Sequence, residues 1–203
     1  MRNAAAIFVA AVALVEADRR AAMAVLERLV PSRGEMMNID AAEGDYLANL
    51  ARKVNAKRAL EIGASNGYSG IWIAMALRET GGRLITVEID RERWTEAQRN
   101  FKDADMAGLV DARLADALAE VPKLEGEFDF VFIDAWKPDY VAYLRLVLPK
   151  VRAGGVIVAH NTRSQSPPIL AFRRALLAEP LLDTQFVEPG PGGFSVSVKR
   201  QSR

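Results

Sequence analysis

Residues 59–69 read Ala-Leu-Glu-Ile-Gly-Ala-Ser-Asn-Gly-Tyr-Ser: a short apolar run, a turn bracketed by Gly63 and Gly67, and the start of a helix near Tyr68. The run predicts a buried strand, because strands covered on both faces are almost continuously apolar. Glycines in such a turn let the backbone approach a ligand closely. The amides at the helix N-terminus can point at a carboxylate or a phosphate. This strand–turn–helix unit indicates a ligand-binding α/β fold.

Strand-like and helix-like segments alternate along the rest of the chain. The runs at 128–134 and 156–159 are nearly all apolar, and the turn-rich segment 189–193 separates the last two strand candidates. Such alternation predicts a parallel sheet with right-handed crossovers, and the turn predicts a hairpin. We expect a doubly wound α/β fold, in which a mostly parallel, seven-stranded, Rossmann-like sheet carries an antiparallel C-terminal hairpin strand. The strand candidates are 59–62, 84–89, 110–114, 128–134, 156–159, 184–187 and 194–199, and the helix candidates are 18–30, 40–54, 68–79, 91–106, 138–150 and 167–178.

The composition excludes several kinds of chemistry. The chain has 203 residues, with 27 Lys and Arg against 26 Asp and Glu, so its formal net charge is +1. General nucleic-acid binders depend on many phosphate-neutralising cations. With a net charge near zero, we expect no nucleic acid as a partner. The chain has no cysteine and a single histidine, His160, which excludes disulfides, thiolate nucleophiles and multi-His metal sites. We expect a small-molecule ligand and no membrane partner, with a monomer and a homodimer both left open.

The N-terminal segment allows two interpretations. Arg2 precedes an uncharged run from Ala4 to Val15, too short to span a membrane. Residues 1–17 are either a cleavable signal peptide or an N-terminal helix packed on the core. We expect residues 18–203 to form a single domain, cytoplasmic in the second case and exported in the first.

Polar residues follow five successive strand candidates. In an open α/β sheet, ligands bind outside the carboxyl ends of the strands. Glu88 ends the second strand, 25 residues after Gly63, where a carboxylate can accept from both hydroxyls of a ribose. The Gly63–Gly67 spacing is G-x-x-x-G, which differs from the dinucleotide fingerprint G-x-G-x-x-G. The pattern indicates an adenosine-type ligand.

Several of these segments resemble a known enzyme family. Residues 37–39, 60–69 and 84–90 look like those of class I S-adenosylmethionine-dependent methyltransferases. Residues 132–140 (Phe-Ile-Asp-Ala-Trp-Lys-Pro-Asp-Tyr) and 154–162 (Gly-Gly-Val-Ile-Val-Ala-His-Asn-Thr) are similar to the small cation-dependent O-methyltransferases. That group includes catechol and caffeoyl-CoA O-methyltransferases, and the similarity runs from about residue 36 to residue 199.

The resemblance implies a role for each matching residue. S-adenosylmethionine would be the cofactor, with the ribose on Glu88, the adenine near Asp116 and Trp136, and the methionine part on Glu61, Gly63 and Ser69. Asn38 and Ile39 would close over it, and Asp134 would also lie against it. A divalent cation would be held by Asp134, His160 and Asn161. The implied catalytic residues are Asp134, His160 and Lys137, with Lys137 as the base.

The sequence departs from the family pattern at two positions: Glu35, where the catechol enzyme has an aromatic substrate-gate residue, and His160. The family has Asp-Asn after the fifth strand, whereas this chain has His160 and Asn161. Imidazole suits softer ions better than Mg²⁺. The cation is therefore Mg²⁺ or a softer ion, is weakly held, or is replaced by His160 acting as a base. A neutral His160 hydrogen-bonded to its loop is the remaining alternative.

These observations lead to one expected function and two alternatives. We expect an S-adenosylmethionine-dependent O-methyltransferase acting on a small, phenolic hydroxyl acceptor, with assistance from a metal. The alternatives are a module that binds the cofactor without turnover and an NAD-dependent oxidoreductase.

Overall fold

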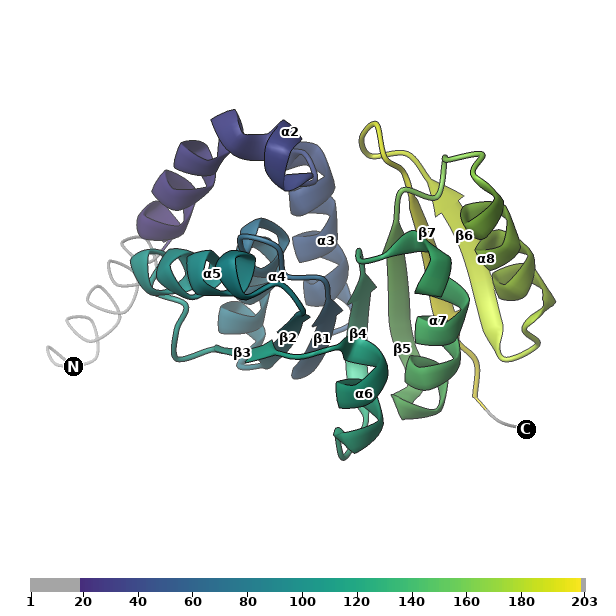
Figure 1. Cartoon of the computed structure of the whole chain (residues 1–203). Helices are drawn as coiled ribbons and strands as arrows, with labels where there is room; N and C mark the ends of the chain where they lie inside the picture. Colours follow the sequence, from purple (N-terminus) through teal and green to yellow (C-terminus); the bar gives the residue numbers. More distant parts are fainter. Residues whose placement is uncertain (1–18, 202–203) are drawn as a thin grey trace, which may run out of the picture.

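The computed structural model describes residues 19–201, which build a seven-stranded sheet in the order β3-β2-β1-β4-β5-β7-β6 (Figure 1). All pairs from β3 to β5 are parallel, while β7 is antiparallel to both β5 and β6. The mostly parallel sheet with a C-terminal hairpin is therefore confirmed. The strands are β1 (Arg58–Ile62), β2 (Arg83–Glu88), β3 (Val110–Leu114), β4 (Phe128–Ile133), β5 (Val151–His160), β6 (Leu182–Val187) and β7 (Phe194–Lys199).

Helices cover both faces of the sheet (Figure 1). Successive side chains of β4 point to opposite faces. Phe130 and Phe132 pack with α3, α4 and α5, while Val131 and Ile133 pack with α7 and α8. The helices are 19–29, α2 (Arg33–Met36), α3 (Ala41–Lys53), α4 (Tyr68–Thr80), α5 (Arg91–Asp103), α6 (Ala117–Glu120), α7 (Tyr140–Val147) and α8 (Pro167–Ala178), with 3₁₀ turns at Val30–Ser32, Val121–Lys123, Lys137–Asp139 and Leu148–Lys150.

Several local features differ from the sequence prediction. Strand β5 begins at Val151 rather than 156, because a register shift against β4 and a positive φ of 76° at Gly154 carry the strand past two glycines. The predicted helix 138–150 is divided into a 3₁₀ turn, α7 and a second 3₁₀ turn, with a proline in the first turn of each 3₁₀ segment. Two short helices were not predicted, α2 and α6, the second of which is capped by Asp116.

The strand order reverses between β1 and β4. From β1 the chain winds outward through β2 and β3, and from β4 it winds the other way through β5. A cleft is expected where the two halves diverge, at the carboxyl ends of these strands.

No helix within residues 19–201 has the length and apolar character that a membrane crossing needs. The predictions for residues 1–17 lie outside the described residues.

Candidate active site

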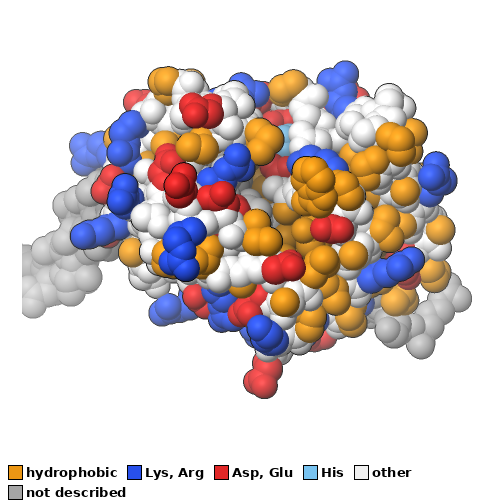
Figure 2. Space-filling model, viewed as in Figure 1, with side chains coloured by type: hydrophobic (Ala, Val, Ile, Leu, Met, Phe, Trp, Pro, Cys, Tyr) orange, Lys and Arg blue, Asp and Glu red, His pale blue; other side chains and the backbone are white. Residues whose placement is uncertain are grey.

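A cleft of about 1190 Å³ opens at the carboxyl ends of β1, β2, β4 and β5. Figure 2 shows this face of the molecule hollowed near its centre, with charged side chains on the rim. All but one of the residues expected to bind cofactor or metal, or to act in catalysis, line the cleft; the exception is Glu61. The lining residues among them are Asn38, Ile39, Gly63, Ser69, Glu88, Asp116, Asp134, Trp136, Lys137, His160 and Asn161.

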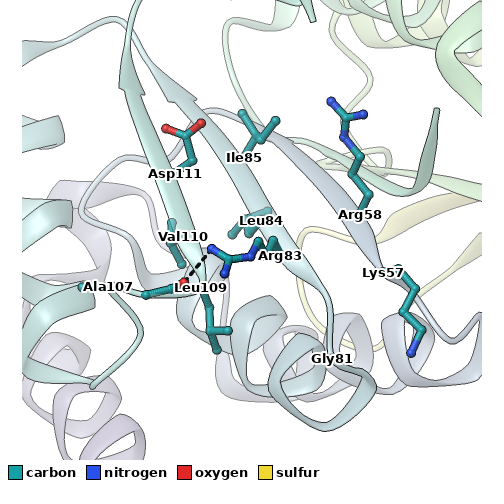
Figure 3. A pocket seen from close by; sticks show the side chains of 11 residues that line it. Lys57, Arg58, Gly81, Arg83, Leu84, Ile85, Ala107, Leu109, Val110 and Asp111 are labelled. Atoms are coloured by element: carbon teal, nitrogen blue, oxygen red, sulfur yellow. Dashed lines mark hydrogen bonds between the residues drawn. The ribbon is translucent and has the colours of Figure 1, made fainter. Parts of the chain in front are cut away.

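A second, smaller hollow of about 470 Å³ lies at the opposite edge, near the amino ends of β1, β2 and β3 (Figure 3). Two of its cationic side chains already interact with other groups of the protein. Arg83 donates to the carbonyl of Gly108 at 3.0 Å, and the Arg58 guanidinium stacks over the Phe128 ring at 4.7 Å. The chemistry-bearing side chains gather in the larger cleft instead.

The glycine turn after β1 brings backbone into the cleft. Gly63 has a φ of 98°, and a Cβ there would overlap the carbonyl oxygen of Asp134, so only glycine fits. Gly67, with a φ of 87°, begins α4. The Glu88 carboxylate accepts from the backbone N–H of Ser65 at 2.7 Å and from that of Asp90 at 2.9 Å. Glu88 therefore ties the turn to the end of β2, at the position expected for a ribose.

Glu61 lies beneath the turn, with none of its surface exposed. Its two oxygens accept from the hydroxyls of Ser69 and Thr86, both at 2.6 Å. Burial, with added repulsion from Asp134 and Glu88, raises the pKa of Glu61 to about 7. Of these residues Ser69 reaches the cleft, so any influence of Glu61 on the methionine part of the cofactor would pass through the Ser69 hydroxyl.

The remaining wall suits an adenosine-type ligand. Trp136 is 69% exposed at the rim, an indole face available for stacking on a planar base. Asp116 is exposed and caps α6 through the Leu118 N–H at 2.8 Å. The buried Nδ2 of Asn38 has no hydrogen-bond partner among the described residues and needs an acceptor. An unpaired donor in the wall and a planar exposed ring on the rim fit S-adenosylmethionine.

Asp134 lies at the centre of a buried ionic cluster. Its Oδ1 accepts from Lys137 Nζ at 3.0 Å and from the Tyr140 hydroxyl at 3.4 Å. Its Oδ2 lies 3.0 Å from His160 Nδ1. Burial alone would raise the pKa of Asp134, but the charges and hydrogen bonds of His160 and Lys137 outweigh it and lower the pKa to about 2.

His160 is clamped between two carboxylates. It is 4% exposed, and its Nε2 lies 3.2 Å from Glu43 Oε1, on the side opposite Asp134. The same Glu43 oxygen accepts from the N–H of Gly192 at 2.9 Å and from that of Gly193 at 3.3 Å. Burial works against protonation of His160, but Asp134 and Glu43 outweigh it and raise its pKa to about 9. His160 is therefore an imidazolium at neutral pH.

Glu43 is the site residue that the sequence analysis missed. Locally it completes a capping box with Asp40 at the start of α3, which is the role its spacing indicates. Its partner His160 is 117 residues away, so no local pattern predicts the contact. Burial raises the pKa of Glu43, but hydrogen bonds from His160 and the Asp40 N–H outweigh burial and leave it below its usual value.

The predicted metal ligands do not fit a divalent cation in this arrangement. A ligating imidazole presents a lone pair, yet each ring nitrogen of His160 faces a carboxylate oxygen. The oxygens of Asp134 are engaged by Lys137 and His160. Within residues 19–201 no three His, Cys, Asp or Glu side chains are grouped so that they can hold a metal ion.

The contacts of His160 with Asp134 and Glu43 predict how the free energy of unfolding depends on pH. Because the folded pKa of His160 is raised to about 9, its stabilisation is complete below about pH 6.5 and is lost as the pH rises through 9. The depressed pKa of Asp134 has the opposite sense, with its stabilisation lost as the pH falls from about 4 through 2. Between pH 6.5 and 9.5 the free energy of unfolding should fall by up to ~3 kcal/mol, as measured by urea denaturation.

The control for this pH dependence is His160→Gln. In this variant the free energy of unfolding should fall much less as the pH rises into the alkaline range. An equal fall in the variant would assign the pH dependence to other groups.

Comparisons with known proteins agree with this geometry. The family model described as O-methyltransferase matches residues 15–166. A catechol O-methyltransferase from Niastella koreensis is 37% identical over 145 residues, covering 70% of this chain and 65% of the relative. One from Mycobacterium tuberculosis is 33% identical over 178 residues, covering 80% of each. The chain spans 54% of a caffeoyl-CoA O-methyltransferase from Zinnia elegans, to which it is 35% identical.

Solved structures show the same fold with the cofactor or its product bound. The O-methyltransferase TomG from Streptomyces achromogenes, in complex with SAM, superimposes with a TM-score of 0.78 at 29% identity, covering 87% of this chain and 90% of that one. An O-methyltransferase from Bacillus cereus in complex with SAH has a TM-score of 0.78 at 28% identity, covering 87% and 91%. The chain therefore belongs to the class I, S-adenosylmethionine-dependent O-methyltransferase family, together with the catechol and caffeoyl-CoA enzymes.

Proposed function

We propose that this chain transfers the methyl group of S-adenosylmethionine to the hydroxyl of a small phenolic acceptor. One observation carries the proposal: the Glu88–glycine-turn wall and the Lys137–Asp134 pair line the same cleft. The named activities of the catechol and caffeoyl-CoA relatives support a phenolic acceptor. Since S-adenosylmethionine is made in the cytosol, the cytoplasm is the proposed location.

Different cleft residues bind different parts of the cofactor. Glu88 accepts from the ribose hydroxyls, Trp136 stacks on the adenine, and Asp116 accepts from its exocyclic amine. Asn38 and Ile39 cover the methionine part, and Ser69 and the Gly63 backbone hold it. When bound, S-adenosylmethionine supplies the methyl group on a positively charged sulfur. Alignment of donor and acceptor in the cleft then contributes much of the rate gain.

Lys137 is the proposed base. Its Nζ lies 3.0 Å from Asp134 Oδ1 and 3.1 Å from the Ala135 carbonyl oxygen, and its side chain is about one-third exposed to solvent. A phenol has a pKa of about 10, so little of it is ionised at neutral pH. To act as the base, the Lys137 ammonium first gives a proton to solvent, to which its side chain is partly exposed, and the resulting amine then takes the hydroxyl proton. Asp134 orients the amine through its hydrogen bond.

The function is tested with labelled S-adenosylmethionine and a panel of catechols, hydroxycinnamates and simple phenols. We expect methyl transfer to at least one phenol. Cofactor binding without transfer to any phenol would indicate a different acceptor class or a binding module. Binding of NAD(H) in place of S-adenosylmethionine would contradict the proposal outright.

Replacing Lys137 with methionine is expected to lower kcat by about 100-fold or more, because general base catalysis contributes about that factor. Lys137→Arg separates the two possible roles of the side chain, since arginine keeps the charge and cannot act as a base. Lys123→Met, at an exposed lysine on the Val121–Lys123 turn, is the matched control. Near-normal turnover by Lys137→Arg would make the residue an electrostatic aid rather than the base.

A further inference from the structure

We propose that the ring of His160, held between Asp134 and Glu43, takes the place of the divalent cation of related enzymes, so that this chain transfers methyl groups without a metal. The inference rests on the proposed function and concerns the same cleft. It is carried by the orientation of the His160 ring, by the packing of the hairpin loop and by the contacts that already occupy the carboxylate oxygens.

The first argument is the orientation of the His160 ring. Nδ1 lies 3.0 Å from Asp134 Oδ2, and Nε2 lies 3.2 Å from Glu43 Oε1. Ionised carboxylates only accept hydrogen bonds, so a ring between two of them carries a hydrogen on each nitrogen. Such a ring has no lone pair for a metal. It presents two N–H donors where a cation would present two coordination positions.

The second argument is steric. Glu43 Oε1 also accepts the N–H groups of Gly192 and Gly193, which fastens the β6–β7 loop over the ring. A Cβ built on Gly192 would overlap His160 Nε2, so the loop backbone packs directly against that side of the ring. An ion bound to Nε2 would therefore have to displace this loop backbone and Glu43.

The third argument is charge. The acidic oxygens of the cluster already have partners: Asp134 Oδ1 accepts from Lys137 Nζ, Asp134 Oδ2 and Glu43 Oε1 face the two ring nitrogens of His160, and Glu43 Oε1 also accepts from the Gly192 N–H. Buried charges are stable when they are paired and hydrogen-bonded, and here the pairing is complete within the protein. Had an aspartate stood at position 160, a third carboxylate would lie beside Asp134 and Glu43 with no hydrogen to donate to either, and a cation would be needed between them. The histidine removes that need.

The reaction balances without a metal. Lys137 first loses one ammonium proton to solvent; the acceptor O–H bond then breaks and its proton goes to the resulting amine. The oxygen lone pair forms the new bond to the methyl carbon. The bond between that carbon and sulfur breaks, and its electron pair stays on sulfur as a neutral thioether. The His160 ring stays in place and positions Asp134, which in turn holds Lys137.

The direct test follows the ring itself. His160 is the single histidine of the chain, so tag-free protein labelled with ¹⁵N-histidine gives two ring nitrogen signals in NMR. We expect each nitrogen to carry a hydrogen, and we expect one equivalent of paramagnetic Mn²⁺ to leave both signals unbroadened. Stoichiometric broadening by Mn²⁺, or a ring with one bare nitrogen, would overturn the proposal. This readout needs no acceptor, so its failure is distinct from failure of the proposed function.

A double variant tests the idea from the other direction. His160→Asp with Glu43→Gln restores an acidic ligand and removes the extra carboxylate that clamps the ring. Mg²⁺ should raise the Tm of this variant and leave that of the wild-type chain unchanged, with Asp183→Asn, on the far edge strand β6, as the control. If the double variant does not fold, the measurement on the wild-type chain still decides. An equal rise of the wild-type Tm with Mg²⁺ would contradict the proposal.

Activity provides the last comparison. Transfer by the wild-type chain should change less than about twofold in excess EDTA, because no step needs a metal. A loss of tenfold or more that Mg²⁺ restores would refute the inference and leave the proposed methyl transfer intact.

Discussion

Glu88→Ala is expected to weaken S-adenosylmethionine binding by about 100-fold. Its buried carboxylate ends β2 at the cleft, where two charge-assisted hydrogen bonds to a ribose contribute about 1.5 kcal/mol or more each. Each 1.4 kcal/mol corresponds to a factor of ten in affinity. The variant also frees the N–H groups of Ser65 and Asp90, which loosens the turn that faces the cofactor. Calorimetric titration with S-adenosylmethionine measures the loss.

The control for this experiment is Glu92→Ala, at an exposed carboxylate on the first turn of α5. It removes the same charge four residues away and should leave the affinity unchanged. Thermal unfolding without ligand shows whether Glu88→Ala acts through general destabilisation. An affinity within threefold of wild type would remove Glu88 from the cofactor site.

Asp134→Ala is expected to have the second large effect, on activity and on stability together. Asp134 links the His160 imidazolium, the Lys137 ammonium and the Tyr140 hydroxyl. Removing one partner of a buried ion pair leaves the other charge uncompensated, which costs about 3–5 kcal/mol. Methyl transfer should fall by about 100-fold or more, since Lys137 loses the group that orients it.

Two comparisons isolate that effect. Asp183→Ala deletes an aspartate on the edge strand β6 and should change neither activity nor stability appreciably. Asp134→Asn keeps the shape but not the charge, so it should lose most of the activity while keeping more of the stability. Wild-type kcat in both Asp134 variants would show that the cluster plays no part in catalysis.

The cofactor half of the cleft could be predicted from the sequence because its signals are local. The turn from Gly63 to Gly67 and the carboxylate of Glu88 each follow an apolar run directly, so strand, turn and ligand-facing residue are read from neighbouring positions. Parallel strands place their carboxyl ends at one edge of the sheet. That rule brings Asp134, Lys137 and His160 together without knowledge of the strand order.

The helical details were less predictable where proline and glycine interrupt the periodicity. Gly154 carries an irregular stretch of β5 that extends the strand well before its apolar part. The short helix α6 depends on the cap by Asp116, a residue that the sequence analysis assigned to the adenine. Hydrophobic periodicity is weak in segments of one helical turn, so it does not predict helices as short as α6.

What the sequence by itself determined is the doubly wound sheet, the glycine turn and the set of polar strand ends, since these follow from hydrophobic pattern and local turn chemistry. What only the tertiary structure decided is the state of His160. Its partner Glu43 comes from α3, 117 residues away in sequence, and Gly192 comes from the C-terminal hairpin. Whether an imidazole binds a metal or forms ion pairs depends on what faces its two nitrogens, and packing between distant segments sets that.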